Sequence, residues 1–566
     1  MKACLRPALS LLCAIIVCRF VLAPIPILAE GARGAVATVH PLATEAAWNA
    51  MDRGGNAVDA AVAAALTLGV VDGFNSGIGG GCFFLARLAD GKIVALDGRE
   101  TAPAAATREM YVRDDHVQPK LSQTGPLAVA VPGALAVYEY AIARHGRLSF
   151  QSHLLNAAKI AEEGFVISEH YARKIADVAD DLVRSAGAFP IFFNADGSPK
   201  KAGEVLKQRD LATTYRAIAR DGSGWFYKGE FAARVDAWMN RIGGIMTADD
   251  LANYRFRERE PLRTTYRNFE IIGFPPPSSG GVHVAQILNL LEPYQMAFLG
   301  TNSADFIHIT AEAMKLAFAD RAYWLGDPDF TPVPRQLVSK SYARALGKNL
   351  HPKRVSVVKG PGRPDKAQSD VFGKHTTHIS TADAEGNWVA CTATINTTFG
   401  SKVVLPGTGV ILNNEMDDFS IQPGLSNYFG LVGSEANAIA PGKRPLSSMS
   451  PTIVLERGKP VLATGAAGGP TIISQTVLSI LWAIDLEFDP QQALSQGRFH
   501  HQWSPDELRI EKSIPESVRN SLEERGHKLN VVDAIGASQT VARPTGSAKF
   551  SAAADPRVPG SSAVVR

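Results

Sequence analysis

GKHTTHISTADAEGNWVACTATINTTFG, residues 373–400, contains two alternating polar and apolar runs joined by the turn DAEGN, which predicts a β-hairpin. A turn centred on Glu385 places Thr376 opposite Thr394, and directly opposed β-carbons lie about 5 Å apart. An ordinary cross-strand threonine pair would explain this arrangement. On this segment alone such a pair is favoured over a nucleophilic hydroxyl at the start of a strand, so the rest of the sequence must decide.

The polar run KGPGRPDKAQSDVF, residues 359–372, precedes the hairpin and predicts a mobile linker over residues 350–375. A cut between His375 and Thr376 would free the Thr376 amine. An α-amino group has a pKa of about 7.7–8, which suits a general base at neutral pH. A hydroxyl is a poor nucleophile without such a base, and Thr394 could orient it. The pattern therefore supports an N-terminal threonine nucleophile made by self-cleavage.

An acyl-transfer site also needs oxyanion donors and charged groups for its substrate. Gly468 and Gly469 in ATGAAGGPTIIS follow a predicted strand, and adjacent glycines let backbone N–H groups approach an oxyanion closely. Polar residues at strand ends and turns supply the remaining candidates, each of which alone is more typical of a solvated or capping residue. These are Arg99, Glu415, Asp418, Ser447 and Ser448.

The N-terminus, MKACLRPALSLLCAIIVCRFVLAPIPILAEG, has a basic start, an apolar stretch and small residues, which predicts a secretory signal peptide over residues 1–29. A membrane anchor is less favoured because Arg19 and two prolines interrupt the apolar run. Removing this segment deletes three basic residues and leaves equal numbers of basic and acidic ones. The mature chain is therefore expected to be periplasmic or secreted, with no membrane anchor and no nucleic-acid-binding charge.

Cys82 and Cys391 remain after the signal, both in apolar runs, which favours buried free thiols but leaves a disulfide open. The run SGIGGGC follows a predicted helix and precedes a strand. This is the reverse of the order in a phosphate-binding loop. The sequence contains no HExxH, CxxC or GxSxG motif, so we expect neither a metal nor a cofactor.

The local patterns alternate along the first part of the chain. AVATVH (35–40) predicts a strand, and GGNAVDAAVAAALTLGVV (54–71) predicts a helix that Asn56 caps. Residues 130–270 are mostly helical in pattern, and FIHITAEAMKLAFADRAYWLGD (306–327) predicts one long helix. After the linker, strand patterns predominate. These patterns predict a mixed α/β chain without internal repeats.

Long motifs then identify a resemblance: GGNAVDAAVA, PPPSSGG, GDPDF, TTHIS, NTTFGS, NNEMDDFS, KRPLSSMSPTIV and RFHHQW. From about residue 34 to the C-terminal AAADPR (552–557), the chain resembles the gamma-glutamyltransferases (gamma-glutamyl transpeptidases) of the N-terminal-nucleophile hydrolase superfamily. The resemblance implies a four-layer αββα sandwich. It also implies a precursor that cuts itself into a large chain, residues 30–375, and a small catalytic chain, residues 376–566, which remain together as a heterodimer.

The resemblance also implies roles for the candidate residues. Thr376 is the nucleophile, Thr394 supports it, and Gly468 with Gly469 forms the oxyanion hole. The remaining residues bind the two charged groups of the γ-glutamyl substrate. Arg99 holds the α-carboxylate with help from Ser447 and Ser448, and Asn396, Glu415 and Asp418 hold the α-amino group.

The implied reaction transfers the acyl group of glutathione or another γ-glutamyl compound to water, an amino acid or a peptide. One alternative is a glutaryl- or cephalosporin-type acylase on the same scaffold, although Asp418 would then lack its cation. Another is a secreted binding protein without activity, which the intact Thr376 argues against. One departure concerns the lid over the site: many bacterial members have Tyr before GLVG, where this chain has Phe429 in NYFGLVG.

Overall fold

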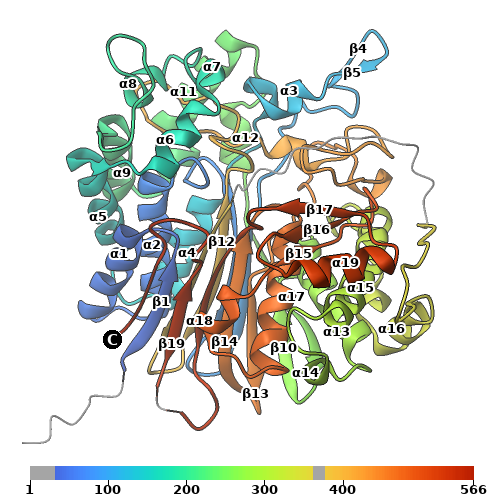
Figure 1. The fold of residues 1–566 in the computed structure, drawn as a ribbon. Helices are drawn as coiled ribbons and strands as arrows, with labels where there is room; N and C mark the ends of the chain where they lie inside the picture. The colour runs from blue at the N-terminus through green and yellow to red at the C-terminus, as the bar shows by residue number, and fades with distance from the viewer. Residues whose placement is uncertain (1–31, 361–375, 548) are drawn as a thin grey trace, which may run out of the picture.

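The computed structural model describes residues 32–360, 376–547 and 549–566, which form four layers with two sheets packed face to face between helices (Figure 1). This arrangement confirms the predicted αββα sandwich. The first sheet has the order β20 (Ser562–Val565), β1 (Gly34–Thr38), β11 (Thr377–Asp383), β12 (Trp388–Thr394), β2 (Gly81–Arg87), β3 (Ile93–Gly98), β8 (Arg257–Arg259). The second has the order β19 (Ser551–Ala554), β18 (Ala537–Ala542), β14 (Lys459–Ala467), β13 (Thr452–Glu456), β10 (Phe269–Gly273), β9 (Leu262–Tyr266).

Apolar side chains fill the space between the two sheets. Phe83 of β2 stacks on Phe274, which follows β10, with ring centroids 4.2 Å apart. Helices cover the two outer faces (Figure 1). On the first sheet these are α1 (Pro41–Asp52), α2 (Ala57–Val71), α4 (Ala134–His145), α5 (Phe150–Glu163) and α9 (Arg209–Asp221). On the second they are α13 (Ser279–Leu291), α15 (Ala304–Trp324) and α17 (Thr471–Ile484).

Helix α2 forms as predicted because its sequence supplies both a cap and a helix-forming interior. The Asn56 side chain accepts the N–H groups of Val58 and Asp59, while the Asp59 side chain accepts the Asn56 N–H, which completes a capping box. Every residue of α2 is buried. Its small alanines let it pack closely against α1, α5 and the β11–β12 hairpin.

The β11–β12 hairpin has the register that the sequence predicts. Thr377 pairs with Ala393 and Ala382 with Trp388, so the residue before β11, Thr376, lies opposite Thr394 at the end of β12. The hairpin is inserted between two strands from the beginning of the chain, because β11 also pairs with β1 and β12 with β2. This placement buries both strands completely.

Residues 351–360 lie against α15 and the C-terminal part of the chain. The Ser356 N–H donates to the Glu312 carboxylate at 2.7 Å, and the Trp503 indole donates to the Val358 carbonyl at 3.1 Å. The rest of the predicted linker and the proposed cleavage position, His375, lie outside the described residues, and so does the predicted signal peptide. In the three described ranges, no helix is long and apolar enough to cross a membrane.

Cys82 and Cys391 are both buried and both free, which decides between the two states that the sequence left open. They lie on the adjacent strands β2 and β12, within the core under α2 and α4. Burial raises the pKa of the Cys82 thiol well above its usual value. Both thiols therefore behave as small apolar side chains.

Candidate active site

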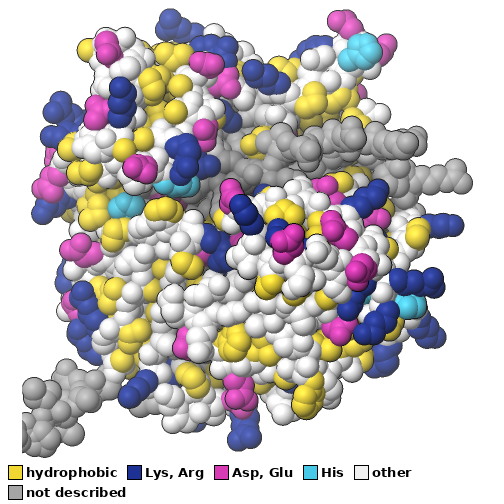
Figure 2. Space-filling model, viewed as in Figure 1, with side chains coloured by type: hydrophobic (Ala, Val, Ile, Leu, Met, Phe, Trp, Pro, Cys, Tyr) yellow, Lys and Arg dark blue, Asp and Glu magenta, His cyan; other side chains and the backbone are white. Residues whose placement is uncertain are grey.

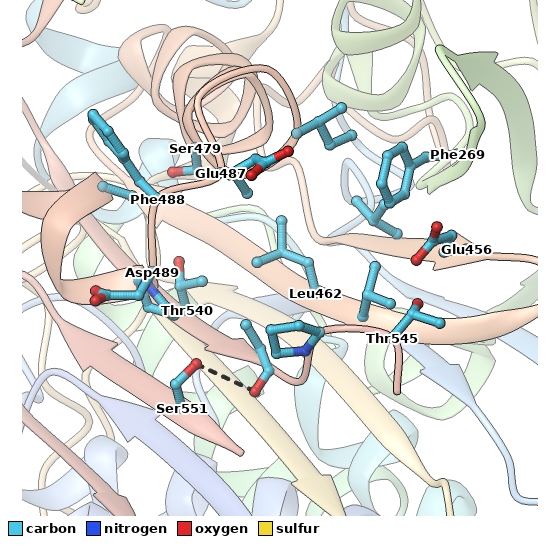
Figure 3. Close-up of a pocket in the computed structure, with 18 residues that line it drawn as sticks. Phe269, Glu456, Leu462, Ser479, Glu487, Phe488, Asp489, Thr540, Thr545 and Ser551 are labelled. Atoms are coloured by element: carbon cyan, nitrogen blue, oxygen red, sulfur yellow. Dashed lines mark hydrogen bonds between the residues drawn. The ribbon is translucent and has the colours of Figure 1, made fainter. Parts of the chain in front are cut away.

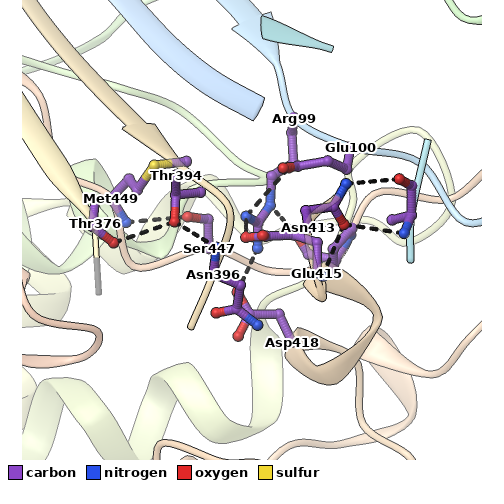
Figure 4. A network of polar contacts seen from close by, with 12 residues as sticks. Arg99, Glu100, Thr376, Thr394, Asn396, Asn413, Glu415, Asp418, Ser447 and Met449 are labelled. Carbon is purple, nitrogen blue, oxygen red and sulfur yellow. Dashed lines mark hydrogen bonds and ion pairs between the residues drawn. The ribbon is translucent and has the colours of Figure 1, made fainter. Parts of the chain in front are cut away.

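Thr376 and Thr394 meet at one end of the hairpin, with their hydroxyl oxygens 3.4 Å apart (Figure 4). Both residues are buried, with 5% and 2% of their surface exposed. The Thr394 oxygen also accepts the backbone N–H of Asn396 at 2.8 Å. That N–H occupies one lone pair of the Thr394 oxygen, and either hydroxyl can donate to the other in the Thr376–Thr394 pair.

Asn396 connects this hydroxyl pair to the acidic part of the site. Its backbone has a φ of 74°, in the left-handed region that asparagine tolerates better than most residues. Its side-chain amide donates to the Asn414 carbonyl at 3.0 Å. Asn414 directly precedes the 3₁₀ helix Glu415–Asp418, so the turn after β12 and this helix are held together.

Arg99 follows strand β3 and is completely buried. Its guanidinium forms ion pairs with Glu415 and with Asp418, the latter at 2.5 Å, and its Nε donates to the Pro445 carbonyl at 3.1 Å (Figure 4). Glu415 and Asp418 begin and end the same 3₁₀ helix, and residues three apart lie on one face of such a helix. A single turn therefore directs both carboxylates at one arginine.

Three buried carboxylates surround Arg99 at this end of the site, and a second buried arginine, Arg321, interacts with Asp418. Glu100 lies 3.6 Å from Arg99 as a third buried acid. Burial raises the pKa of Glu415, of Asp418 and of Glu100, that of Glu100 to about 7, although Arg99 opposes each rise. Burial lowers the pKa of Arg99, but Glu415 and the other two carboxylates raise it above its usual value. A ligand cation would be favoured here.

Ser447 and Ser448 lie between the segment around Phe429 and strand β13, and Arg321 holds the Ser448 side chain. Arg321, on α15, donates to Ser448 Oγ at 3.2 Å and to Ser279 Oγ at 3.0 Å. Burial lowers the Arg321 pKa to about 10, so it remains a cation at neutral pH. Arg321 was not among the residues predicted from the sequence, although a basic residue on the buried face of a long predicted helix was a usable signal.

Gly468 and Gly469 connect β14 to α17, with φ values of 131° and 56°. Both angles favour glycine, and a Cβ on Gly468 would lie 2.5 Å from the Thr471 hydroxyl. The Gly468 carbonyl accepts both the N–H and the hydroxyl of Thr471. Among the described residues, neither glycine N–H has a hydrogen-bond acceptor.

The segment around Phe429 covers the site. The Phe429 ring packs on Gly469, where an added Cβ would lie 2.6 Å from a ring carbon. Asn427, a second residue that the sequence analysis missed, donates to Asp418 Oδ1 at 3.3 Å. The Gln502 amide donates to the carbonyls of Phe429 and Gly430. The segment is therefore held by its backbone and by Asn427, without a hydroxyl at position 429.

These contacts converge on one pocket. Among the described residues, every predicted site residue except Gly468 lines it. The space left inside is about 20 Å³, because Arg99 contacts Asp418 directly and Phe429 covers the opening. The pocket thus joins a hydroxyl pair at one end to a charged cluster at the other.

Comparisons with known proteins give one consistent family. The gamma-glutamyltranspeptidase family model matches residues 43–565. The glutathione hydrolase proenzyme of Escherichia coli K12 is 41% identical over 531 residues, which cover 93% of this chain and 90% of that protein. Acylase ACY 1 proenzyme of Pseudomonas sp. SE83 is 40% identical over 88% of each chain. A crystal structure of cephalosporin acylase from Bacillus halodurans superposes with a TM-score of 0.81 and 29% identity, covering 94% of this chain and 96% of that one.

Proposed function

We propose that this chain, which belongs to the gamma-glutamyltranspeptidase family, cleaves the γ-glutamyl bond of glutathione and related amides through an ester on Thr376. Family membership makes the chain an enzyme of the gamma-glutamyltransferase and glutathione hydrolase class. One observation carries the finer proposal: Thr376, Thr394, Gly469 and the Arg99 cluster line a single pocket.

The proposed reaction begins when Thr376 Oγ attacks the γ-carbonyl carbon of the substrate. The Thr376 α-amine accepts the hydroxyl proton, and the N–H groups of Gly468 and Gly469 stabilise the oxyanion. The tetrahedral intermediate expels the amine of the leaving group, which takes that proton and leaves a γ-glutamyl ester. Water, an amino acid or a peptide then attacks the ester carbonyl and restores the Thr376 hydroxyl.

Recognition of the γ-glutamyl group would replace the Arg99–Asp418 contact with two contacts to the substrate. The α-carboxylate would take the place of Asp418 beside Arg99, which can donate two parallel hydrogen bonds to it. The α-ammonium would then bind Asp418 and Glu415, with the side-chain oxygen of Asn396 nearby. The arrangement of Arg99 between Glu415 and Asp418 supports this assignment, because Arg99 can pair with the α-carboxylate while the two acids pair with the ammonium.

Activity would require a cut between His375 and Thr376, since only the cut creates the α-amine base. Attack of Thr376 Oγ on the His375 carbonyl would give an ester that water hydrolyses. Removal of the signal peptide 1–29 and this cut would give chains 30–375 and 376–566. The N-terminal pattern supports export, and we propose a periplasmic or secreted enzyme without a membrane anchor.

The two chains would stay together as a heterodimer because both sheets contain strands from both. In the first sheet, β11 and β12 lie between β1 and β2. In the second sheet, β13 of the small chain pairs with β10 of the large chain. Separating the chains would break ladders in both sheets and expose the core between them.

An acid-quench experiment tests for the proposed γ-glutamyl ester on Thr376. The enzyme is mixed with a γ-glutamyl anilide, quenched during turnover and measured by mass spectrometry. The expected result is a γ-glutamyl adduct on the 376–566 chain, located at its first residue by fragmentation. An adduct on another residue, or N-terminal sequencing that finds another start, would contradict the Thr376 assignment.

A second candidate function is a glutaryl- or cephalosporin-type acylase, which the similarity to acylase ACY 1 and to the cephalosporin acylase structure favours. A glutaryl group lacks the α-amine, so Asp418 would have no partner on it. Comparing release from γ-glutamyl and glutaryl anilides separates the two activities. We expect the γ-glutamyl anilide to be the better substrate, and a preference for the glutaryl anilide would support the acylase.

A further inference from the structure

The two N–H groups of Gly468 and Gly469 belong to peptide units whose carbonyl ends are both held by side chains. A trans peptide unit is planar, and its C=O and N–H point in opposite directions. The direction of the Ala467 carbonyl therefore sets that of the Gly468 N–H, and the Gly468 carbonyl sets that of the Gly469 N–H. Groups that bind these two carbonyls fix both N–H groups from behind.

Gln475 and Thr471, on the first two turns of α17, bind these carbonyls. Gln475 is 1% exposed, and its Nε2 donates to the Ala467 carbonyl at 2.9 Å and to the Thr471 hydroxyl at 3.1 Å. The Gly468 carbonyl accepts the Thr471 hydroxyl at 2.8 Å and the Thr471 N–H at 3.2 Å. One end of α17 thus holds both peptide units.

Arg498 determines which way the Gln475 amide points. Its Nη1 donates to the Gln475 side-chain oxygen at 3.1 Å, and Ser538 Oγ donates to the same oxygen at 3.1 Å. Because a guanidinium can only donate, the Gln475 oxygen must face Arg498, and its NH₂ group must face Ala467. The reverse amide orientation would place an NH₂ group against Arg498 and an oxygen against the Ala467 carbonyl oxygen.

Arg498 is itself held in one position. Basic side chains usually lie at the surface, as they do on the face drawn in Figure 2, but Arg498 is completely buried. It forms an ion pair with Asp555 at 2.6 Å and donates to the Ile535 carbonyl at 3.0 Å. Asp555 also accepts the Ser538 N–H at 2.6 Å. A buried and connected polar network of this kind is rigid.

Two glycines leave space for the Gln475 amide. A Cβ on Gly536 would lie 1.8 Å from Gln475 Nε2, and the φ of Gly536 is 60°. A Cβ on Gly468 would lie 3.3 Å from the same nitrogen. The amide therefore packs directly against the backbone at both positions, which leaves little room for the peptide unit beside it to rotate.

We infer that Gln475 and Thr471 are positioning residues for the oxyanion hole and that Arg498 holds Gln475, which rests on the proposed function of the two glycine N–H groups. Rotation of either peptide unit would turn an N–H away from the oxyanion and break a bond to Gln475 or Thr471. Fixed donors stabilise a transition state because they need not reorganise during the reaction. The contribution should therefore appear in kcat rather than in KM.

The later turns of α17 supply matched controls. Thr476, next to Gln475, is fully buried, and its hydroxyl donates to the Ile472 carbonyl at 2.9 Å within the helix. Ser479 lines a cavity of about 380 Å³ farther along the helix, and its hydroxyl has no hydrogen-bond partner among the described residues (Figure 3). Thr476→Val and Ser479→Ala therefore perturb the same helix without removing a bond to residues 467–469, and kcat should stay within about twofold.

Steady-state kinetics of the mature enzyme with a γ-glutamyl anilide test the inference. Gln475→Met keeps the length of the side chain but has no donor, and it should lower kcat about tenfold with KM changed less than about twofold. Thr471→Val should lower kcat about threefold, because the N–H of residue 471 still binds Gly468, and Thr471→Ser should keep the parent value. Each kcat is expressed per 376–566 chain, so that slower self-cleavage does not count as slower turnover. An unchanged kcat in Gln475→Met would overturn the inference.

A tetrahedral analogue separates positioning from a merely structural role. A glutamate analogue with a boronic acid in place of the γ-carboxyl binds the Thr376 oxygen through boron and places an oxygen where the oxyanion forms. Gln475→Met should weaken its inhibition about tenfold. Inhibition by 2-aminobutyrate, which has the same α-amino and α-carboxylate groups but no γ-carboxyl, should change less than about twofold. Equal losses for both inhibitors would show that the whole pocket is distorted and would overturn the positioning role.

The parent enzyme distinguishes failure of this inference from failure of the proposed function. A parent that does not turn over the γ-glutamyl anilide, or that binds the boronic acid away from Thr376, would overturn the proposed function and the positioning role together. A parent that behaves as proposed, with Thr476→Val as impaired as Gln475→Met, would overturn the positioning role alone. Any lost bond in α17 would then have the same effect.

Discussion

At one end of the Thr376 pocket lie two neutral hydroxyls and the backbone of Gly469, whereas at the other end Arg99 is buried among carboxylates. The neutral end is built on strand ends, where register and backbone angle place each group. The charged end joins residues more than 300 positions apart in the sequence. Activity should therefore depend on single atoms at the first end and on the balance of several charges at the second.

The largest expected effect is at the neutral end. Thr376→Ala removes the attacking oxygen, so it should abolish turnover and leave residues 30–566 as one chain. Gel electrophoresis and a γ-glutamyl anilide assay measure both outcomes. Thr376→Ser keeps a hydroxyl and should still cleave. Two bands from Thr376→Ala would place the nucleophile elsewhere.

Gly469→Ala should lower kcat by about 10²–10³, the usual cost of losing an oxyanion donor. The added Cβ meets the Phe429 ring and strains a φ of 56°, which moves the N–H away from the oxyanion. Gly458→Ala is a matched control, because its φ is 77° and nothing lies within 4 Å of the added Cβ. A comparable kcat loss in the control would mean that backbone strain, not the lost donor, explains the effect.

Asp418→Asn tests the charged end. Truncating one partner of a buried charge pair typically costs about 2–3 kcal/mol, which is roughly a 30- to 150-fold loss of kcat/KM for a γ-glutamyl anilide. A glutaryl anilide has no α-amine and should lose much less. Arg99→Lys should impair both substrates, since both carry a carboxylate that needs the guanidinium. Equal losses for Asp418→Asn on both substrates would show that Asp418 does not bind the amine.

Glu100→Gln tests whether the charge balance limits stability. The folded-state pKa of Glu100, about 7, lies above its usual 4.5, so the folded protein retains a proton that the unfolded chain loses. The free energy of unfolding should therefore fall as pH rises from about 4.5 to 7, by roughly 1–3 kcal/mol, and then level off. Urea unfolding of Glu100→Gln should lack this fall, while exposed Glu516→Gln keeps it. A fall that persists in Glu100→Gln would assign it to another group.

The smallest effect is expected at Phe429, in the segment that covers the pocket. Phe429→Tyr adds a hydroxyl to a segment that Asn427 and Gln502 already hold. It should change kcat/KM for a γ-glutamyl anilide by less than about threefold, below 1 kcal/mol. A larger gain would show that a hydroxyl at this position controls closure.

The sequence by itself determined the parts of this protein that depend on local chemistry. The alternation around DAEGN fixed the hairpin register, so Thr376 was correctly placed opposite Thr394. Asn56 and Asp59 fixed the start of α2, and the adjacent glycines marked a turn that only glycine adopts easily. Each signal lies within a few residues of the structure that it predicts, because hydrogen bonds and backbone angles act over that range.

Only the tertiary structure decided how the charged end is built. The sequence identified Arg99, Glu415 and Asp418 as candidates, but not that Arg99 pairs with Asp418, that Glu100 joins them, or that Arg321 fixes Ser448. The contact of Asn427 with Asp418 depends likewise on segments that meet only after folding. Ionic contacts and cavities have no sequence period, because they depend on distance and burial in space rather than on spacing along the chain.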